Sequence, residues 1–128
     1  MATTVGQYCI NVSDLDRSIG FYDGLLGVPV QRRVEGDGFT EVVLAADEGG
    51  GRMQLARHHD EPGPIEHGNA LWKIYFNVDD VAEVCRRVAD AGYEVEGPPV
   101  RLERWPVTIA FVRDPDGYRI ELLQHHDD

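Results

Sequence analysis

The chain repeats its own pattern of structural elements after 66 positions. A strand-like run ends at Val12 and another at Val78, and each is followed directly by apolar residues spaced three and four apart. That spacing is typical of an amphipathic helix with one buried face. The predicted buried positions are Leu15, Ile19, Tyr22 and Leu26 in the first helix, and Val81, Val84, Cys85 and Val88 in the second. We therefore expect two similar halves.

Capping residues mark the predicted ends of both helices. Ser13 and Asp80 are the expected N-caps, because each precedes its helix and has an acidic residue three positions later. Gly27 and Gly92 should end the helices, since glycine adopts the left-handed conformation at little cost. Three strand candidates follow each helix, at about 28–35, 38–46 and 51–57, and at about 93–100, 106–113 and 118–124. Each half is thus predicted to be a βαβββ module.

The two modules are expected to form a single α+β domain, residues 1–128. The first module spans about 5–57 and the second about 70–124. The segment 58–69 between them contains proline and glycine without periodicity, which is typical of a linker. A half of roughly 60 residues would be marginally stable alone, so the modules should share one continuous or paired mixed sheet.

Charge and cysteine content limit the classes of partner. The chain has 23 acidic and 12 basic residues and a net charge of −11, which repels phosphate backbones, so we expect no nucleic acid partner. No apolar run approaches the roughly 20 residues of a membrane span, and the N-terminus lacks the profile of a signal peptide. Cys9 and Cys85 are too few for a disulfide scaffold. We expect a cytoplasmic protein with free thiols and no membrane contact.

One face of the predicted strands is polar. Side chains alternate along a strand, and the polar set consists of Gln7, Asn11, Gln54, Lys73, Tyr75 and Glu121. Gln7 and Lys73 are 66 positions apart. Gln54 and Glu121 are 67 apart, so these four residues occupy equivalent places in the two halves. The set is either the solvated side of an antiparallel sheet or a site, and its symmetry favours a site.

Three motifs resemble one known family. They are Asp14–Ser18 running into Phe21-Tyr22 and Leu26-Gly27, the helix start Val78-Asp79-Asp80, and the closing run FVRDPDGYRIEL at 111–122. Together they resemble the vicinal oxygen chelate superfamily, which includes glyoxalase I, bleomycin-resistance proteins and ring-cleaving dioxygenases. The resemblance covers roughly residues 5–124 and implies paired βαβββ modules that form a cupped sheet, commonly in a homodimer. It leaves the function open, since one fold hosts many chemistries.

The resemblance also implies where a metal would bind. Enzymes of this superfamily usually hold a divalent metal with four side chains, and the matching positions are Gln7, Gln54, Lys73 and Glu121. Gln54 replaces the usual glutamate, and Lys73 replaces the usual histidine. A divalent ion needs a donor with a lone pair, and an ammonium group has none to give. We therefore expect no cofactor, with a divalent metal at these positions as the alternative.

Lys73 is the only lysine in the chain. Lysine, unlike arginine, changes its protonation readily and can act as an acid, a base or an amine nucleophile. Two interpretations follow. Lys73 is either the salt-bridge partner of Glu121, its charge standing in for a lost metal, or the group that receives a carboxylate, enolate or carbonyl oxygen of a ligand while Glu121 moves a proton.

Aromatic residues are further candidates for ligand contact. Trp105 lies nine positions before Asp114, where bleomycin-resistance proteins often carry an aromatic that stacks on the drug. Further aromatic rings are available at Trp72, Tyr75, Tyr8 and Phe39. Each of them is equally explained by packing within the sheet or a dimer.

These patterns favour a homodimer that binds a small organic molecule in a metal-free cavity, as bleomycin-resistance proteins do. The predicted site residues are Lys73 and Glu121, with ligand contacts from Gln7, Asn11, Gln54, Tyr75 and Trp105. Two alternatives stay open. One is an isomerase or lyase of the glyoxalase type that acts next to a carbonyl, with Lys73 as electrophile and Glu121 as general base. The other is a metal-dependent glyoxalase or dioxygenase. Whether the chain is an enzyme is open at this point.

Overall fold

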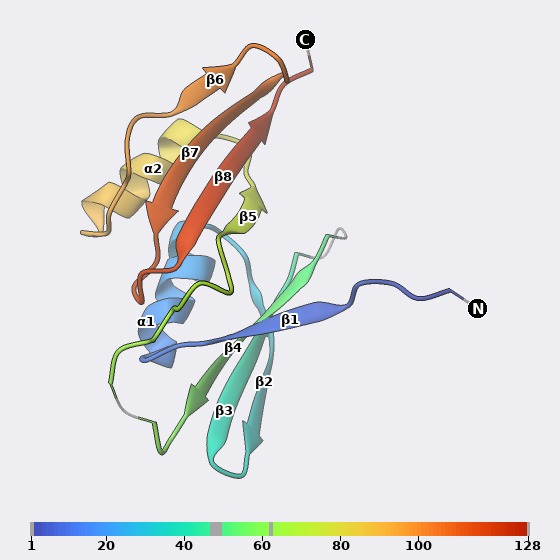
Figure 1. The fold of residues 1–128 in the computed structure, drawn as a ribbon, viewed down its shortest axis with the longest axis vertical. Coiled ribbons are helices and arrows are strands. Elements are labelled where there is room, and N and C mark those ends of the chain that lie inside the picture. Colours follow the sequence, from blue (N-terminus) through green and yellow to red (C-terminus); the bar gives the residue numbers. More distant parts are fainter. Residues whose placement is uncertain (1, 47–49, 62, 128) are drawn as a thin grey trace. The chain divides into compact units, whose positions relative to one another are not determined.

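The structure is a computed structural model that describes residues 2–46, 50–61 and 63–127. The chain divides into two units, Met1–Ile65 and Glu66–Asp128, and the boundary falls inside the segment 58–69. Each unit contains a strand, a helical segment and three more strands in that order (Figure 1). The prediction of an α+β protein made of two βαβββ modules is confirmed.

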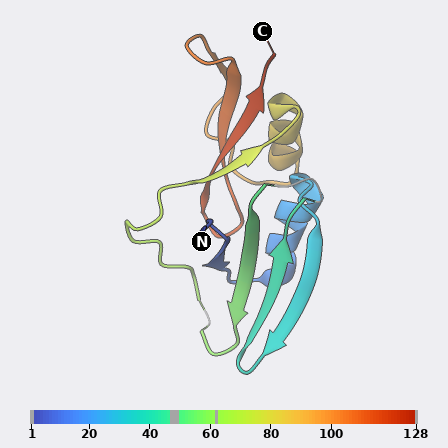
Figure 2. The ribbon, with the colours of Figure 1, turned by 90° about the vertical axis from the view of Figure 1, so that its right-hand side faces the viewer.

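The first unit builds a four-stranded mixed sheet and one helical segment. Its elements are β1 (Gln7–Asn11), α1 (Leu15–Ile19), the π-helical turn η1 (Gly20–Leu25), β2 (Val30–Gly36), β3 (Phe39–Leu44) and β4 (Arg52–His58). The strand order is β1-β4-β3-β2. β1 runs parallel to β4, and the other pairs are antiparallel. Figure 2 shows β2, β3 and β4 side by side with α1 next to them, and α1 contacts β4.

The second unit repeats this topology. Its elements are β5 (Ile74–Asn77), α2 (Val81–Asp90), β6 (Val100–Leu102), β7 (Val107–Arg113) and β8 (Arg119–His125). The strand order is β5-β8-β7-β6, with β5 parallel to β8 and the remaining pairs antiparallel. The parallel pair lies where the chain crosses over through α2, as a parallel connection requires. First and last strands of each unit are therefore neighbours.

The apolar faces predicted from helical spacing are buried. All four predicted positions of α2 are buried, and so are three of the four in α1 and η1, while Ile19 is partly exposed. α2 contacts β7 and β8, whose residues Ile120 and Leu122 are fully buried. Each such side chain contributes about 1.5–3 kcal/mol when it leaves water. None of the helices in the described part of the chain has the length and apolar character that a membrane crossing requires.

The two helix starts compare differently with the prediction. Asp80 caps α2 as expected, because its side chain accepts a hydrogen bond from the backbone N–H of Glu83. The prediction of Ser13 is wrong by one position, since Asp14 is the residue whose carboxylate accepts the N–H of Arg17, at 3.1 Å. Asp14 has the extended backbone that an N-cap needs, φ −143°. Gly27 and Gly92 take the predicted left-handed conformation, with φ of 83° and 91°.

The strand predicted at 93–100 is wrong. The structure forms only β6 (Val100–Leu102) and an isolated bridge from Val95 to Val112. Pro98 and Pro99 have no N–H to donate to a neighbouring strand. Gly97 has a φ of 145°, which interrupts the extended chain before them. The other strand predictions agree with β2, β3, β4, β7 and β8 to within a few residues.

Candidate active site

Lys73 and Glu121 form a short ion pair in the second unit. Tyr75 of β5 lies opposite Glu121 of β8, and Lys73, two residues before Tyr75, projects from the same face as both. The Lys73 Nζ donates a hydrogen bond of 2.6 Å to the Glu121 Oε1. The side chains are only 11% and 9% exposed, respectively. The ion pair that the salt-bridge interpretation predicts is present, and it is withdrawn from most of the solvent.

Aromatic rings surround the ammonium group. The Lys73 Nζ lies 4.0 Å from the ring centroid of Trp72, 5.0 Å from that of Tyr75 and 5.4 Å from that of Phe111. The negative face of an aromatic ring attracts a cation at such distances. The rings therefore favour the charged form of Lys73 in a place that water reaches poorly.

The surroundings keep Lys73 protonated. The hydrogen bond to Glu121 is the largest cause that raises the pKa of Lys73 above its ordinary value, and partial burial opposes it. A protonated amine has no lone pair, so Lys73 is not an amine nucleophile at neutral pH. It has three N–H donors, of which Glu121 accepts one. The arrangement can therefore stabilise negative charge on a ligand oxygen beside a carboxylate.

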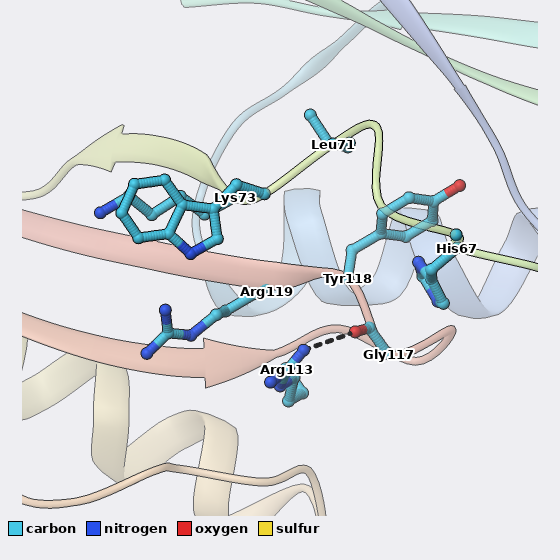
Figure 3. A pocket seen from close by; sticks show the side chains of 9 residues that line it. His67, Leu71, Lys73, Arg113, Gly117, Tyr118 and Arg119 are labelled. Carbon is cyan, nitrogen blue, oxygen red and sulfur yellow. Dashed lines mark hydrogen bonds between the residues drawn. The ribbon is translucent and has the colours of Figure 1, made fainter.

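A cavity of about 230 Å³ opens beside this ion pair. The segment 67–73 forms one wall, and the adjoining ends of β7 and β8 form the other (Figure 3). His67 holds the segment against the β7–β8 turn, because its Nε2 lies 2.8 Å from the carbonyl oxygen of Asp116 and its ring packs edge-on to Tyr118. Lys73 lines this cavity, so a small molecule bound in it reaches the ammonium group.

The predicted polar residues of the first unit lie on β1 and β4. Gln7 and Asn11 are exposed on β1, opposite Arg52 and Ala56 of β4. Gln54 is half-buried, and its Nε2 donates a hydrogen bond of 2.8 Å to the Glu41 Oε2 on β3. The offset of 67 positions between Gln54 and Glu121 did not predict this contact of Gln54 with Glu41.

Cys9 lies opposite Gln54 in the β1–β4 register. Loss of hydration and, to a lesser extent, the Glu41 carboxylate raise the pKa of the Cys9 thiol. A raised pKa keeps the sulfur protonated and weakly nucleophilic. Both cysteines are free, as predicted.

Comparison with known proteins decides the family. Residues 4–122 match the family described as the Glyoxalase/Bleomycin resistance protein/Dioxygenase superfamily. The chain belongs to this superfamily. It is similar to a protein of Vibrio cholerae named "Probable lactoylglutathione lyase", with 34% identity over 119 residues that cover 91% of this chain and 86% of that protein.

Solved structures of glyoxalase I resemble this superfamily member closely. The glyoxalase I of Leishmania major aligns with a TM-score of 0.80 and 30% identity, over 96% of this chain and 87% of that one. The glyoxalase I of Zea mays aligns with a TM-score of 0.83 and 25% identity. That alignment covers 94% of this chain but only 44% of the maize protein, so the chain spans less than half of its length.

The comparisons correct the predicted function. A drug-sequestering protein of the bleomycin-resistance type was the favoured prediction, and it is wrong. Relatives that share about a third of their residues with the chain over nine-tenths of its length are named "Lactoylglutathione lyase" or "Probable lactoylglutathione lyase". These findings favour the alternative of a glyoxalase-type lyase.

The four positions at which superfamily enzymes hold a metal do not suit a divalent ion here. Two are neutral amides, Gln7 and Gln54, and the Gln54 amide nitrogen is bonded to Glu41. The third is the Lys73 ammonium, which holds the fourth, Glu121, in a 2.6 Å ion pair. A divalent ion prefers carboxylate, imidazole or thiolate donors, and a neighbouring ammonium repels it. Among the described residues no cluster of three or more His, Cys, Asp or Glu is placed to hold a metal.

The structure does not bring Trp105 to the Lys73–Glu121 pair within the second unit. Trp105 lies in the turn between β6 and β7 and is 57% exposed. Its neighbour Pro106 accepts a hydrogen bond from His126, just past the end of β8, whereas Lys73 lies near the start of β8. The indole packs under the guanidinium of Arg104 instead.

Sequence reasoning missed three residues around the ion pair. Phe111 lies directly opposite Glu121, and Arg113 lies opposite Arg119, in the β7–β8 register. The turn Asp114-Pro115-Asp116-Gly117 was recognisable in the sequence, and a tight turn fixes the register of its two strands. Counting outward from that turn would have placed Phe111 beside Glu121.

Proposed function

We propose that the chain is a lyase of the glyoxalase I type, which interconverts the hemithioacetal of a 2-oxo aldehyde and the thioester of a 2-hydroxy acid. The lactoylglutathione lyase names of its relatives support this reaction and suggest glutathione as the thiol. The carrying observation is the short ion pair of Lys73 and Glu121. Its lysine lines a cavity and lies close to three aromatic rings.

The reaction moves one proton between adjacent carbons. In the hemithioacetal, Glu121 removes the proton from the carbon that bears sulfur and hydroxyl. The electron pair of that C–H bond forms an enediolate with the neighbouring carbonyl group. The same proton is then returned to the former carbonyl carbon, and the hydroxyl proton of the first carbon passes to the oxygen on the second. The product is the 2-hydroxy thioester, and no atom is gained or lost.

Lys73 stabilises the negative charge of the enediolate in this proposal. Its ammonium donates to the oxygen on which charge develops, in surroundings where both partners are mostly withdrawn from water. Oε1 of Glu121 accepts the Lys73 hydrogen bond, so the second carboxylate oxygen, Oε2, is the proposed proton acceptor. The residues at the usual metal positions do not suit a divalent ion, so no step requires one.

An assay with two matched variants tests this function. Thioester formation from 2-oxopropanal and glutathione is followed by ultraviolet absorbance. We expect Glu121→Gln to lower kcat by about 10²–10⁴ and Lys73→Met by about 10²–10³. Glu83→Gln makes the same chemical change on the far side of α2 and should leave kcat unchanged. Absence of turnover by the unmodified protein, or full activity of both site variants, would contradict the proposal.

Further features belong to the same proposal. Tyr75 of the second unit is a proposed ligand contact, and so, each by itself, are Gln7, Asn11 and Gln54 of the first. We also propose that residues 1–128 act as one functional domain, that the protein works as a homodimer, and that it is cytoplasmic. Size-exclusion chromatography with light scattering tests the homodimer directly.

A further inference from the structure

The segment that leads into β5 is irregular, and a side chain fixes each of its ends. Residues 67–73 lie outside the helices and strands, with a turn at 68–70. Lys73 at the far end pairs with Glu121. His67 at the near end is exposed, yet its Nε2 lies 2.8 Å from the backbone carbonyl oxygen of Asp116, 49 positions away in sequence. The position of Lys73 is therefore set by contacts at both ends of this segment.

The imidazole of His67 has a defined orientation and a defined hydrogen. A carbonyl oxygen accepts hydrogen bonds and donates none, so Nε2 of His67 carries the hydrogen that it shares with Asp116. The ring packs edge-on against Tyr118, with centroids 4.6 Å apart and planes at 81° (Figure 3). Aromatic rings favour this arrangement. Tyr118 thus orients the imidazole toward its hydrogen-bond acceptor.

The turn that receives His67 has a well-fixed backbone. Asp114 is only 3% exposed, and its Oδ1 accepts the backbone N–H groups of Asp116 and Tyr118, each at 2.9 Å. Aspartate commonly stabilises turns in this way. Gly117 has a φ of 88°, and a Cβ at this position would lie 3.5 Å from the His67 Nε2. The imidazole therefore packs closely against a turn that is held by its own hydrogen bonds.

We propose that His67 is a positioning residue for Lys73. An irregular segment anchored at one end samples many more conformations than one anchored at both. The hydrogen bond from His67 to Asp116 fixes the start of the segment 67–73, and it thereby restricts the Lys73 ammonium to the neighbourhood of Glu121. Where the inference concerns catalysis it rests on the proposed function, and where it concerns the Lys73–Glu121 pair it does not.

Two substitutions and one matched control isolate this hydrogen bond. His67→Ala removes the donor, whereas His67→Gln keeps an N–H donor at the end of a flexible side chain. His125→Ala is the control, because the His125 Nε2 lies 3.0 Å from the Asn77 Oδ1 in another exposed hydrogen bond, at the opposite end of β5. The control removes a comparable contact from the same strand pair without releasing the segment 67–73.

A spectroscopic measurement tests the positioning without turnover. Lys73 is the only lysine, so selective ¹³C labelling of lysine gives a single set of side-chain NMR signals. We expect the Cε signal of His67→Ala to move part of the way toward its position in Glu121→Gln, and that of His67→Gln to stay at the unmodified position. His125→Ala should leave the signal unchanged. An unmoved signal in His67→Ala, or an equal displacement by His125→Ala, would overturn the inference.

Kinetic constants distinguish positioning from direct contact with a ligand, since His67 also lines the cavity. Lys73 acts on charge that develops during the reaction, so His67→Ala should lower kcat about three- to tenfold and leave KM unchanged. His67→Gln should restore kcat, and His125→Ala should have the unmodified value. A raised KM with unchanged kcat would place His67 on the ligand instead and overturn the inference, as would a loss of kcat without a change of the Lys73 signal.

The two measurements separate this inference from the proposed reaction. If the unmodified protein shows no turnover but the Lys73 signal moves in His67→Ala and not in His67→Gln, the reaction fails and the positioning stands. If turnover occurs and neither kcat nor the Lys73 signal responds to His67→Ala, the reaction stands and the positioning fails. Circular dichroism establishes that each variant is folded before it is compared.

Discussion

The side-chain nitrogen of Lys73 lies 2.6 Å from Oε1 of Glu121, although 48 positions separate the two residues in sequence. The contact is possible because β5 and β8, the first and last strands of the second unit, are parallel neighbours. Tyr75 opposite Glu121 and Phe111 on its other side complete the surroundings. The sole lysine of the chain, one residue before β5, is therefore held by its contact with Glu121 of β8.

Breaking this pair should destabilise the protein strongly. Lys73→Met leaves the Glu121 carboxylate nearly buried without its cation, which costs about 3 kcal/mol of unfolding free energy. The double variant Lys73→Met with Glu121→Gln removes both charges, so it should recover a large part of that loss. Urea unfolding followed by circular dichroism measures all three proteins.

An exposed ion pair provides the control for this cycle. Arg33 and Glu35 lie 3.1 Å apart with side chains that are more than half exposed. Arg33→Met should cost only about 0–1 kcal/mol. A loss for Lys73→Met as small as that for Arg33→Met would show that burial of the Lys73–Glu121 pair contributes nothing.

The charge of Lys73 should persist into alkaline solution. The Glu121 hydrogen bond raises the pKa of Lys73, so its stabilisation is fully present below the unfolded lysine value of about 10.4 and is lost as the pH rises through the higher folded value. Reductive methylation with ¹³C gives one lysine side-chain NMR signal besides the terminal amine, because Lys73 is the only lysine. Its titration should move to lower pH in Glu121→Gln. A folded-state pKa below the ordinary lysine value would refute the prediction.

Removal of metal should leave the protein unchanged. Because an ammonium group pairs with the one carboxylate among Gln7, Gln54, Lys73 and Glu121, we expect prolonged dialysis against a chelator to alter neither turnover nor the unfolding midpoint. Lys73→His places an imidazole beside Glu121 and should bind Zn²⁺ more tightly than the unmodified chain in calorimetry. Activity lost to the chelator and restored by Zn²⁺ or Ni²⁺ would contradict the prediction.

Much of the fold could be predicted because the sequence repeats local signals. Helical spacing after Val12 and Val78, an acidic cap at Asp80 and glycines at positions 27 and 92 each specify local backbone structure. The Lys73–Glu121 contact was also accessible, since alternation puts both side chains on the polar face of their strands.

Other features of the site depend on tertiary contacts, which the alternation of side chains along a strand does not predict. A solvated face was one of the two interpretations of the polar residues, yet Glu121 is only 7% exposed and its carboxylate is paired with Lys73. The pairing of Arg113 and Arg119 with Glu96 depends on where the irregular segment before β6 lies, and periodicity does not describe such a segment. Trp105 was predicted to contact a ligand because of the family resemblance. In the structure its turn lies near the end of β8, whereas Lys73 lies near the start of that strand.

The one-residue difference at the first cap gives a final prediction. Asp14 accepts the backbone N–H of Arg17, whereas the Ser13 hydroxyl accepts a hydrogen bond from the exposed Arg17 side chain. Asp14→Ala should therefore cost about 1 kcal/mol of unfolding free energy, as should Asp80→Ala at the equivalent place in α2. Ser13→Ala should cost less than half of that, since an exposed side-chain hydrogen bond competes with water. Urea unfolding of the three variants measures these losses of unfolding free energy. A larger loss for Ser13→Ala than for Asp14→Ala would show that Ser13 is the N-cap.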